Sequence, residues 1–151
     1  MQKVDSKNFD PRFNPDLTPK QMLKLGIFGG WYFEVRTKGV PVDILKLANT
    51  SKSGKKDPKL NYFKISASQS LAVWQKKGWI NAADPNGWFE WYIKYFYGRR
   101  LPQEDDRQIK RWLAMRRHIT QIKNNCRAGD IYCRPRQRQA LLHWAYDSRM
   151  M

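Results

Sequence analysis

The sequence contains few cysteines, few acidic residues and no long apolar run. Its 151 residues include only two cysteines, Cys126 and Cys133, which are too few for a disulfide scaffold. No window approaches the roughly 18 apolar residues of a membrane span, and the polar N-terminus MQKVDSKNFDPRF lacks the apolar core of a signal peptide. We therefore expect a soluble, cytoplasmic protein whose two thiols stay free.

The shortage of acids leaves a strongly basic chain. Only 13 Asp and Glu stand against 29 Lys and Arg, which gives a formal net charge of +16. Such a charge creates a positive field that attracts phosphate polymers or anionic surfaces. Nucleic acid, either DNA or RNA, is the partner that this balance favours. An acidic protein partner and an inert basic surface are the alternatives, and no membrane partner is expected.

Local signals predict an all-α fold. We expect a single compact domain of five or six helices over residues 18–151, preceded by an irregular N-terminal arm at residues 1–17. In the first helix Thr18 and Gln21 have capping-box spacing, Pro19 suits the first helical position, and Gly26 ends the helix. A hydrophobic content of 41% supplies material for one core.

Weaker signals place two more helices, at residues 42–48 and 66–78. The second has capping-box spacing at Ser66 and Gln69 and a stop at Gly78. Between them, NTSKSGKKDPK at residues 49–59 has the composition of an exposed loop. The Gly29-Gly30 pair permits a tight bend, but the GxxxxGK[ST] pattern of a phosphate-binding loop is absent.

The stretch GWFEWYIKYFYGRR, residues 87–100, is half aromatic and could form either a core helix or a platform for stacked nucleobases. On a helix, Glu90, Lys94 and Tyr97 share one narrow stripe, and aromatic residues cover the rest. Because burial of each large side chain is worth roughly 1.5–3 kcal/mol, we favour the core helix, placed at the centre of the domain. The stripe should then face water.

The second half of the chain is rich in arginine, with eleven of the thirteen arginines in residues 99–151. Residues 102–126 read as one long amphipathic helix, which Pro102 begins and whose first turn holds Glu104, Asp105 and Asp106. A last helix follows Pro135, with Arg136 and Arg138 crowded at its N-terminus, where a bound phosphate would offset their charge. The predicted nucleic-acid contacts are Arg99, Arg100, Arg107, Lys110, Arg111, Arg117, Arg134, Arg136 and Arg138.

An enzyme acting on DNA or RNA is a second hypothesis. Its acid/base groups would come from Asp84, Glu90 or residues 104–106, beside His118 or His143, but no nucleophile–base spacing supports it. A zinc site is disfavoured because His118 and Cys126 would lie about 12 Å apart along a helix. No metal or cofactor is predicted. A structural or partner-binding role, as in a virion, is the third hypothesis.

Five segments of the chain are distinctive: GIFGGWYF, LNYFKISASQSLAVWQKKGWI, DPNGWFEWYIKYFYGRR, EDDRQIKRW and CRPRQRQALLHWAYDSR. Together they resemble a family of small uncharacterised basic proteins encoded in phage, algal and bacterial genomes. The resemblance covers nearly all of the chain from about Asp16. It implies no activity, cofactor or catalytic residue, and a phage origin is compatible with a DNA-associated or virion role.

Overall fold

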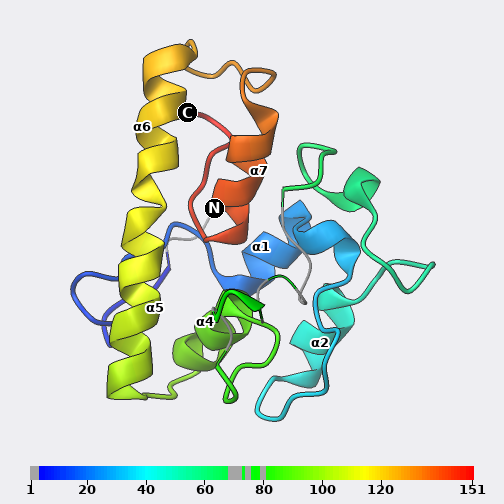
Figure 1. Cartoon of the computed structure of the whole chain (residues 1–151), viewed down its shortest axis with the longest axis vertical. Coiled ribbons are helices and arrows are strands. Elements are labelled where there is room, and N and C mark those ends of the chain that lie inside the picture. The colour runs from blue at the N-terminus through cyan, green and yellow to red at the C-terminus, as the bar shows by residue number, and fades with distance from the viewer. Residues whose placement is uncertain (1–3, 68–72, 74–75, 79–80) are drawn as a thin grey trace.

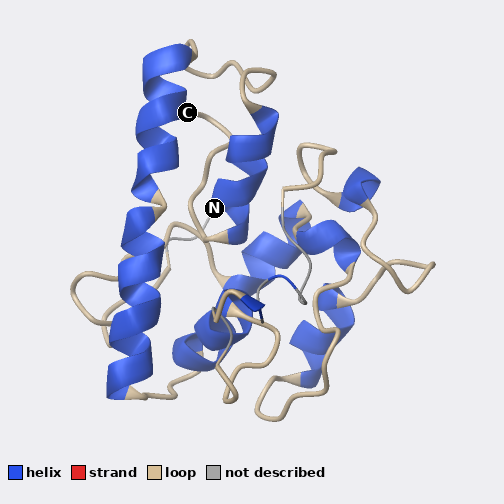
Figure 2. Ribbon diagram, in the orientation of Figure 1, coloured by secondary structure: helices blue, strands red, loops and turns tan. Residues whose placement is uncertain are grey.

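The computed structural model describes residues 4–67, 73, 76–78 and 81–151 (Figure 1). Within these residues the chain forms helices and no strand, which confirms the predicted all-α class (Figure 2). The α-helices are α1 (Pro19–Leu25), α2 (Val42–Ala48), α4 (Trp88–Phe96), α5 (Pro102–Ala114), α6 (Arg116–Asn125) and α7 (Pro135–His143). Two short 3-10 helices are η1 (Phe28–Gly30) and η2 (Pro58–Leu60). No described helix has both the length and the apolar character to span a bilayer.

Helix α1 begins and ends where its sequence signals predict. The Thr18 side chain accepts from the Gln21 amide at 3.1 Å, and the Gln21 side chain accepts from the Thr18 amide at 2.9 Å, which completes the capping box. Gly26 follows with a φ of 105°, a conformation that favours glycine. The second predicted capping box, at Ser66 and Gln69, lies largely outside the described residues.

Helix α4 is the centre of the core, as predicted. Every residue from Trp88 to Tyr95 is buried. The N-terminal arm lies against this helix and inserts Phe13, whose ring centroid is 5.3 Å from that of Trp91 and 5.0 Å from that of Trp112 in α5. Aromatic pairs at such distances add stabilisation beyond the burial of their area. The aromatic stretch therefore serves as the core and not as a stacking platform.

The prediction that a stripe of α4 faces water is wrong for two of its three residues. Glu90 is fully buried and Lys94 is 7% exposed, and only Tyr97, just past the helix, reaches solvent. Thr37 donates to the Glu90 carboxylate, and the Ala83 carbonyl accepts from Lys94. Both contacts come from loops that precede α4 in the chain, so the charged stripe is covered by the chain itself.

The predicted long helix over residues 102–126 is interrupted once. Helices α5 and α6 lie nearly in line (Figure 1), but Met115 separates them. The Trp112 carbonyl accepts the Tyr146 hydroxyl at 2.7 Å and the Met115 amide at 3.1 Å. A side chain that enters the ladder of backbone hydrogen bonds is a common cause of such a break.

The prediction of free thiols is also wrong, because Cys126 and Cys133 form a disulfide. Helices α6 and α7 run side by side in opposite directions (Figure 1), so the loop between them returns close to where it left. The two Cα atoms lie 5.8 Å apart, within the range that a disulfide bridges. Two cysteines that are too few for a scaffold can therefore still pair where the fold brings them together.

Candidate nucleic-acid interface

Arg99 and Arg100, at the end of α4, are held by groups of the protein itself. Arg99 forms a two-pronged ion pair with the buried Asp84 carboxylate, at 2.8 and 2.6 Å. The Arg100 guanidinium lies 3.7 Å from the centroid of the Tyr95 ring and donates to the carbonyls of Tyr95 and Asn8 at 2.8 Å. Both side chains thus fix the chain around α4.

Two predicted cations on α5 pair with acids of the same helix. Arg107 bonds the Glu104 carboxylate at 2.5 and 3.0 Å, and Lys110 lies 2.9 Å from Asp106. The carboxylates of the first turn therefore act in ion pairs three and four residues apart, in addition to their favourable place at the helix N-terminus.

Arg138 is a buried structural residue. Its side chain is inaccessible to solvent and donates to the carbonyls of Cys133 at 2.7 Å, Ser148 at 3.0 Å and Met151 at 2.8 Å. These bonds tie the C-terminal segment to α7. The charge that the sequence places near the N-terminus of α7 is thus met by carbonyl groups, and we leave Arg138 out of the interface proposed below.

Three of the predicted arginines, Arg117 in α6 and Arg134 and Arg136 at the start of α7, form what we call the arginine cluster. Gln137 of α7 bonds His118 Nδ1 of α6 at 3.0 Å, which places Arg136 and Arg117 at the same level of the helix pair. Arg134 donates to the Gln137 side chain at 3.0 Å. Arg117 and Arg136 are exposed, and neither forms an ion pair or hydrogen bond with any residue that the structure describes.

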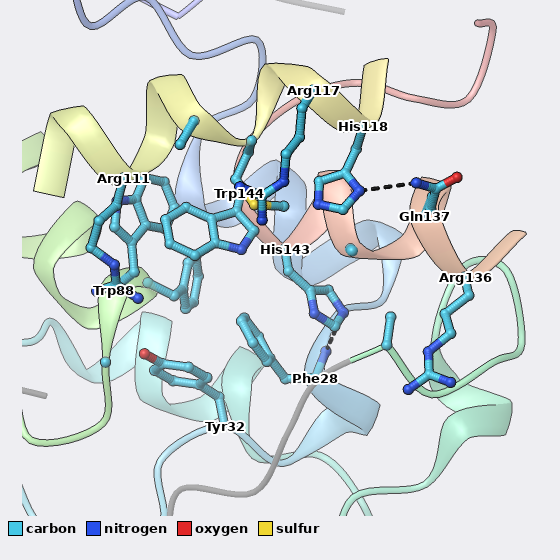
Figure 3. Close-up of a pocket in the computed structure, with 16 residues that line it drawn as sticks. Phe28, Tyr32, Trp88, Arg111, Arg117, His118, Arg136, Gln137, His143 and Trp144 are labelled. Atoms are coloured by element: carbon cyan, nitrogen blue, oxygen red, sulfur yellow. Dashed lines mark hydrogen bonds between the residues drawn. The ribbon is translucent and has the colours of Figure 1, made fainter. Parts of the chain in front are cut away.

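Arg117 and Arg136 also line a cavity of about 510 Å³ between α4, η1 and the helix pair (Figure 3). Among its described lining residues are five aromatic side chains and a further arginine, and none is acidic. These residues are Phe28, Tyr32, Trp88, Phe89, Trp144 and Arg111. The walls therefore combine aromatic faces with cationic groups, a combination suited to a planar anion.

Arg111 is the most enclosed of the cavity arginines. Its guanidinium carbon lies 5.3 Å from the centroid of the Trp144 ring, and its Nη1 donates to the Gln108 side chain at 2.9 Å. Burial, and to a smaller extent the neighbouring Arg107, lowers the pKa of Arg111 to about 10. It remains charged at neutral pH.

His143 forms part of the cavity wall as a neutral side chain. Its Nε2 accepts from the Phe28 amide at 3.3 Å and from the Gln139 side chain at 3.1 Å, so the ring proton resides on Nδ1. The orientation of Gln139 is fixed because its carbonyl oxygen accepts from the Phe63 amide at 2.9 Å. Burial, followed by the charge of Lys56, lowers the pKa of His143 to about 3.

Phe28 holds a strained backbone at this wall. Its φ is 54°, in the left-handed region that non-glycine residues rarely adopt, and its ring stacks on His143 with centroids 4.2 Å apart. Such conformations cost about 1–3 kcal/mol and persist where the surroundings enforce them. The hydrogen bond from the Phe28 amide to His143 supplies part of that restraint.

The acids of the enzyme hypothesis lie elsewhere. Asp84 and Glu90 meet at Lys94 beneath the loops that cover α4. Asp105 accepts from the Trp91 indole at 2.8 Å and from the Leu101 amide at 2.9 Å. None of these carboxylates lines the cavity, and neither histidine bonds one among the described residues.

The sequence did not predict that residues from several helices would line one cavity. No role is predicted from the sequence for Gln137 or Gln139, although each glutamine bonds a histidine. The one sequence feature that indicates the Gln139–His143 hydrogen bond is their spacing of four residues on one helix face. The cavity walls come together because α6 packs against α7, and no local sequence pattern predicts that packing.

No protein-family model, curated protein or solved structure matches this chain. The resemblance drawn from the sequence motifs therefore stays a prediction.

Proposed function

We propose that the protein binds nucleic acid and that the arginine cluster contacts its phosphates. The observation that carries the proposal is the state of Arg117 and Arg136, which are exposed and unpaired among the described residues. The other seven predicted cations each have at least one acceptor or acid within the chain. A phosphate group offers the paired oxygens that an arginine fork binds best.

The surroundings of the cluster favour an anion as well. The described cavity walls carry no acid, and α7 has no side-chain cap at its N-terminus beside Arg136. Helix amides without a partner and the helix dipole both add to the attraction for a phosphate. The net charge of +16 would speed encounter with a phosphate polymer.

The test is a salt titration of binding. Purified, nuclease-treated protein is titrated against labelled duplex DNA, single-stranded DNA and RNA by fluorescence anisotropy at several salt concentrations. If phosphates are bound, log K falls linearly with log salt, by about 0.9 per contact on duplex DNA and about 0.7 on single strands. The double variant Arg117→Gln with Arg136→Gln should lower the magnitude of the single-strand slope by about 1.4.

The matched control is Lys24→Gln with Lys46→Gln, which removes the same charge from exposed positions of α1 and α2 outside the cavity. An equal effect of the two double variants would mean that general charge, and not the cluster, drives binding. Absence of binding to any nucleic acid near physiological salt would refute the proposal and favour an acidic protein partner.

A further inference from the structure

The loop between α6 and α7 presents an unusually exposed aromatic side chain. Tyr132 is 88% exposed, and Met150, which is 81% exposed, is the next of the large apolar side chains that the structure describes. Both lie at the same end of the molecule, because the Gly129 amide of the loop donates to the carbonyl of Met151 at 3.1 Å. Figure 1 shows this loop at the far end of the helix pair.

The backbone that carries Tyr132 is held from several sides. The Cys126–Cys133 disulfide closes the loop, and the Tyr132 amide donates to the Asp130 side chain at 3.1 Å. The buried Arg138 donates to the Cys133 carbonyl at 2.7 Å. Among the described residues, no hydrogen bond or ring contact of the Tyr132 side chain accounts for its position. A restrained loop that displays a free aromatic ring loses little entropy when the ring binds.

The charged side chains of the segment that carries Tyr132 are almost all positive. Residues 121–140 contain a single acid, Asp130, whose carboxylate accepts from the Tyr132 amide. The exposed cations of the same stretch are Lys123, Arg127, Arg134 and Arg136. Arg127 and Arg134 each follow a half-cystine, so the disulfide holds them at the two ends of one short loop. The partner that complements this tip is anionic and offers flat apolar faces.

We propose that Tyr132 stacks on an unpaired base of a single-stranded nucleic acid while Arg127 and Arg134 contact the adjoining phosphates. This inference rests on the proposed function and adds the class of substrate. In a duplex the base faces are covered by their neighbours, and a ring on a convex tip does not reach them. In a single strand the faces are open, and stacking on an aromatic side chain tolerates any base.

The experiment compares Tyr132→Ala with the wild-type protein on oligonucleotides of equal length, single-stranded and duplex. Loss of one stacked base should weaken single-strand binding by about 5- to 150-fold and leave duplex binding unchanged. The salt slope should not change, because no phosphate contact is lost. Tyr132→Trp should restore the affinity. Tyr97→Ala is the matched control, since Tyr97 is an exposed tyrosine of another part of the fold.

A direct readout comes from the Tyr132 ring protons in NMR spectra, which should move upfield when a single-stranded oligonucleotide is added. Unchanged single-strand affinity in Tyr132→Ala, with the effect of Arg117→Gln and Arg136→Gln intact, would overturn the stacking proposal and leave the proposed function standing. Equal weakening on single strands and duplex would also overturn it. A wild-type protein that binds no nucleic acid would overturn both.

Discussion

Replacement of Lys94 by methionine tests the buried charge network of α4. The Lys94 ammonium lies 2.6 Å from the Glu90 carboxylate, 3.2 Å from Asp84 and 2.8 Å from the Ala83 carbonyl. Glu90 and Asp84 are fully buried. Lys94→Met keeps most of the side-chain volume but leaves the Glu90 charge without its cation. Removal of one partner from a buried ion pair costs about 3–5 kcal/mol.

We expect a loss near the lower end of that range, about 3 kcal/mol, because Arg99 still neutralises Asp84 and three donors still bond Glu90. The assay is urea unfolding followed by tryptophan fluorescence, compared at equal m-values. Lys110→Met is the matched control. Lys110 also follows an acid by four residues on a helix, but it is 67% exposed, so its loss should have little measurable effect.

A second variant separates charge from packing. Glu90→Gln combined with Lys94→Met removes both charges while the glutamine can still accept from Asn86. It should be more stable than Lys94→Met alone, since no uncompensated charge stays buried beside the helix. The proposed role of the charge network is refuted if Lys94→Met lowers the free energy of unfolding no more than Lys110→Met does. It is also refuted if the double variant is less stable than Lys94→Met alone.

Three further predictions concern other parts of the fold. Replacement of Cys126 and Cys133 by serine should lower the free energy of unfolding by about 2.5 kcal/mol, the entropy of closing a loop of this length, and reductant should then have no further effect on the melting temperature. Arg138→Met should free the C-terminal segment, so limited proteolysis should cut at Arg149 in this variant and not in Arg136→Met. For His143, a pKa of about 3 in the folded protein and about 6.5 in the unfolded chain means that the unfolded state binds more protons between these values. Stability should therefore fall by about 2 kcal/mol as the pH drops from 7 to 5, and His143→Gln should flatten this dependence; an equal dependence in the variant would contradict it.

The parts of the fold that sequence predicts well are those that depend on near neighbours. The Thr18–Gln21 capping box, the proline at the start of α5 and the aromatic run of α4 all take effect within a few residues. The stripe of Glu90 and Lys94 was misread because an acid and a base four residues apart have the same spacing on a buried face and on an exposed one. Part of what buries them is a loop more than fifty residues earlier in the chain.

The disulfide and the cavity could not be predicted for the same physical reason. Each depends on the antiparallel return of α7 along α6, and neither helix records that return in its own sequence. His143 was identified as a residue of interest, but its neutral state follows from its burial against residues far away in the chain, among them Phe28.

Because many of the predicted cations are already paired within the chain, the number of phosphate contacts should be smaller than the net charge suggests. A cation that is paired with an acid of the chain is already neutralised and has fewer donors left for a phosphate. If all nine predicted cations bound phosphate, the slope of log K against log salt on single strands would be about −6. The arginine cluster with Arg127 supplies four cations, which corresponds to a slope of about −3. A measured slope near −6 would mean that the ion pairs of α4 and α5 open on binding, and it would contradict an interface confined to α6, α7 and their loop.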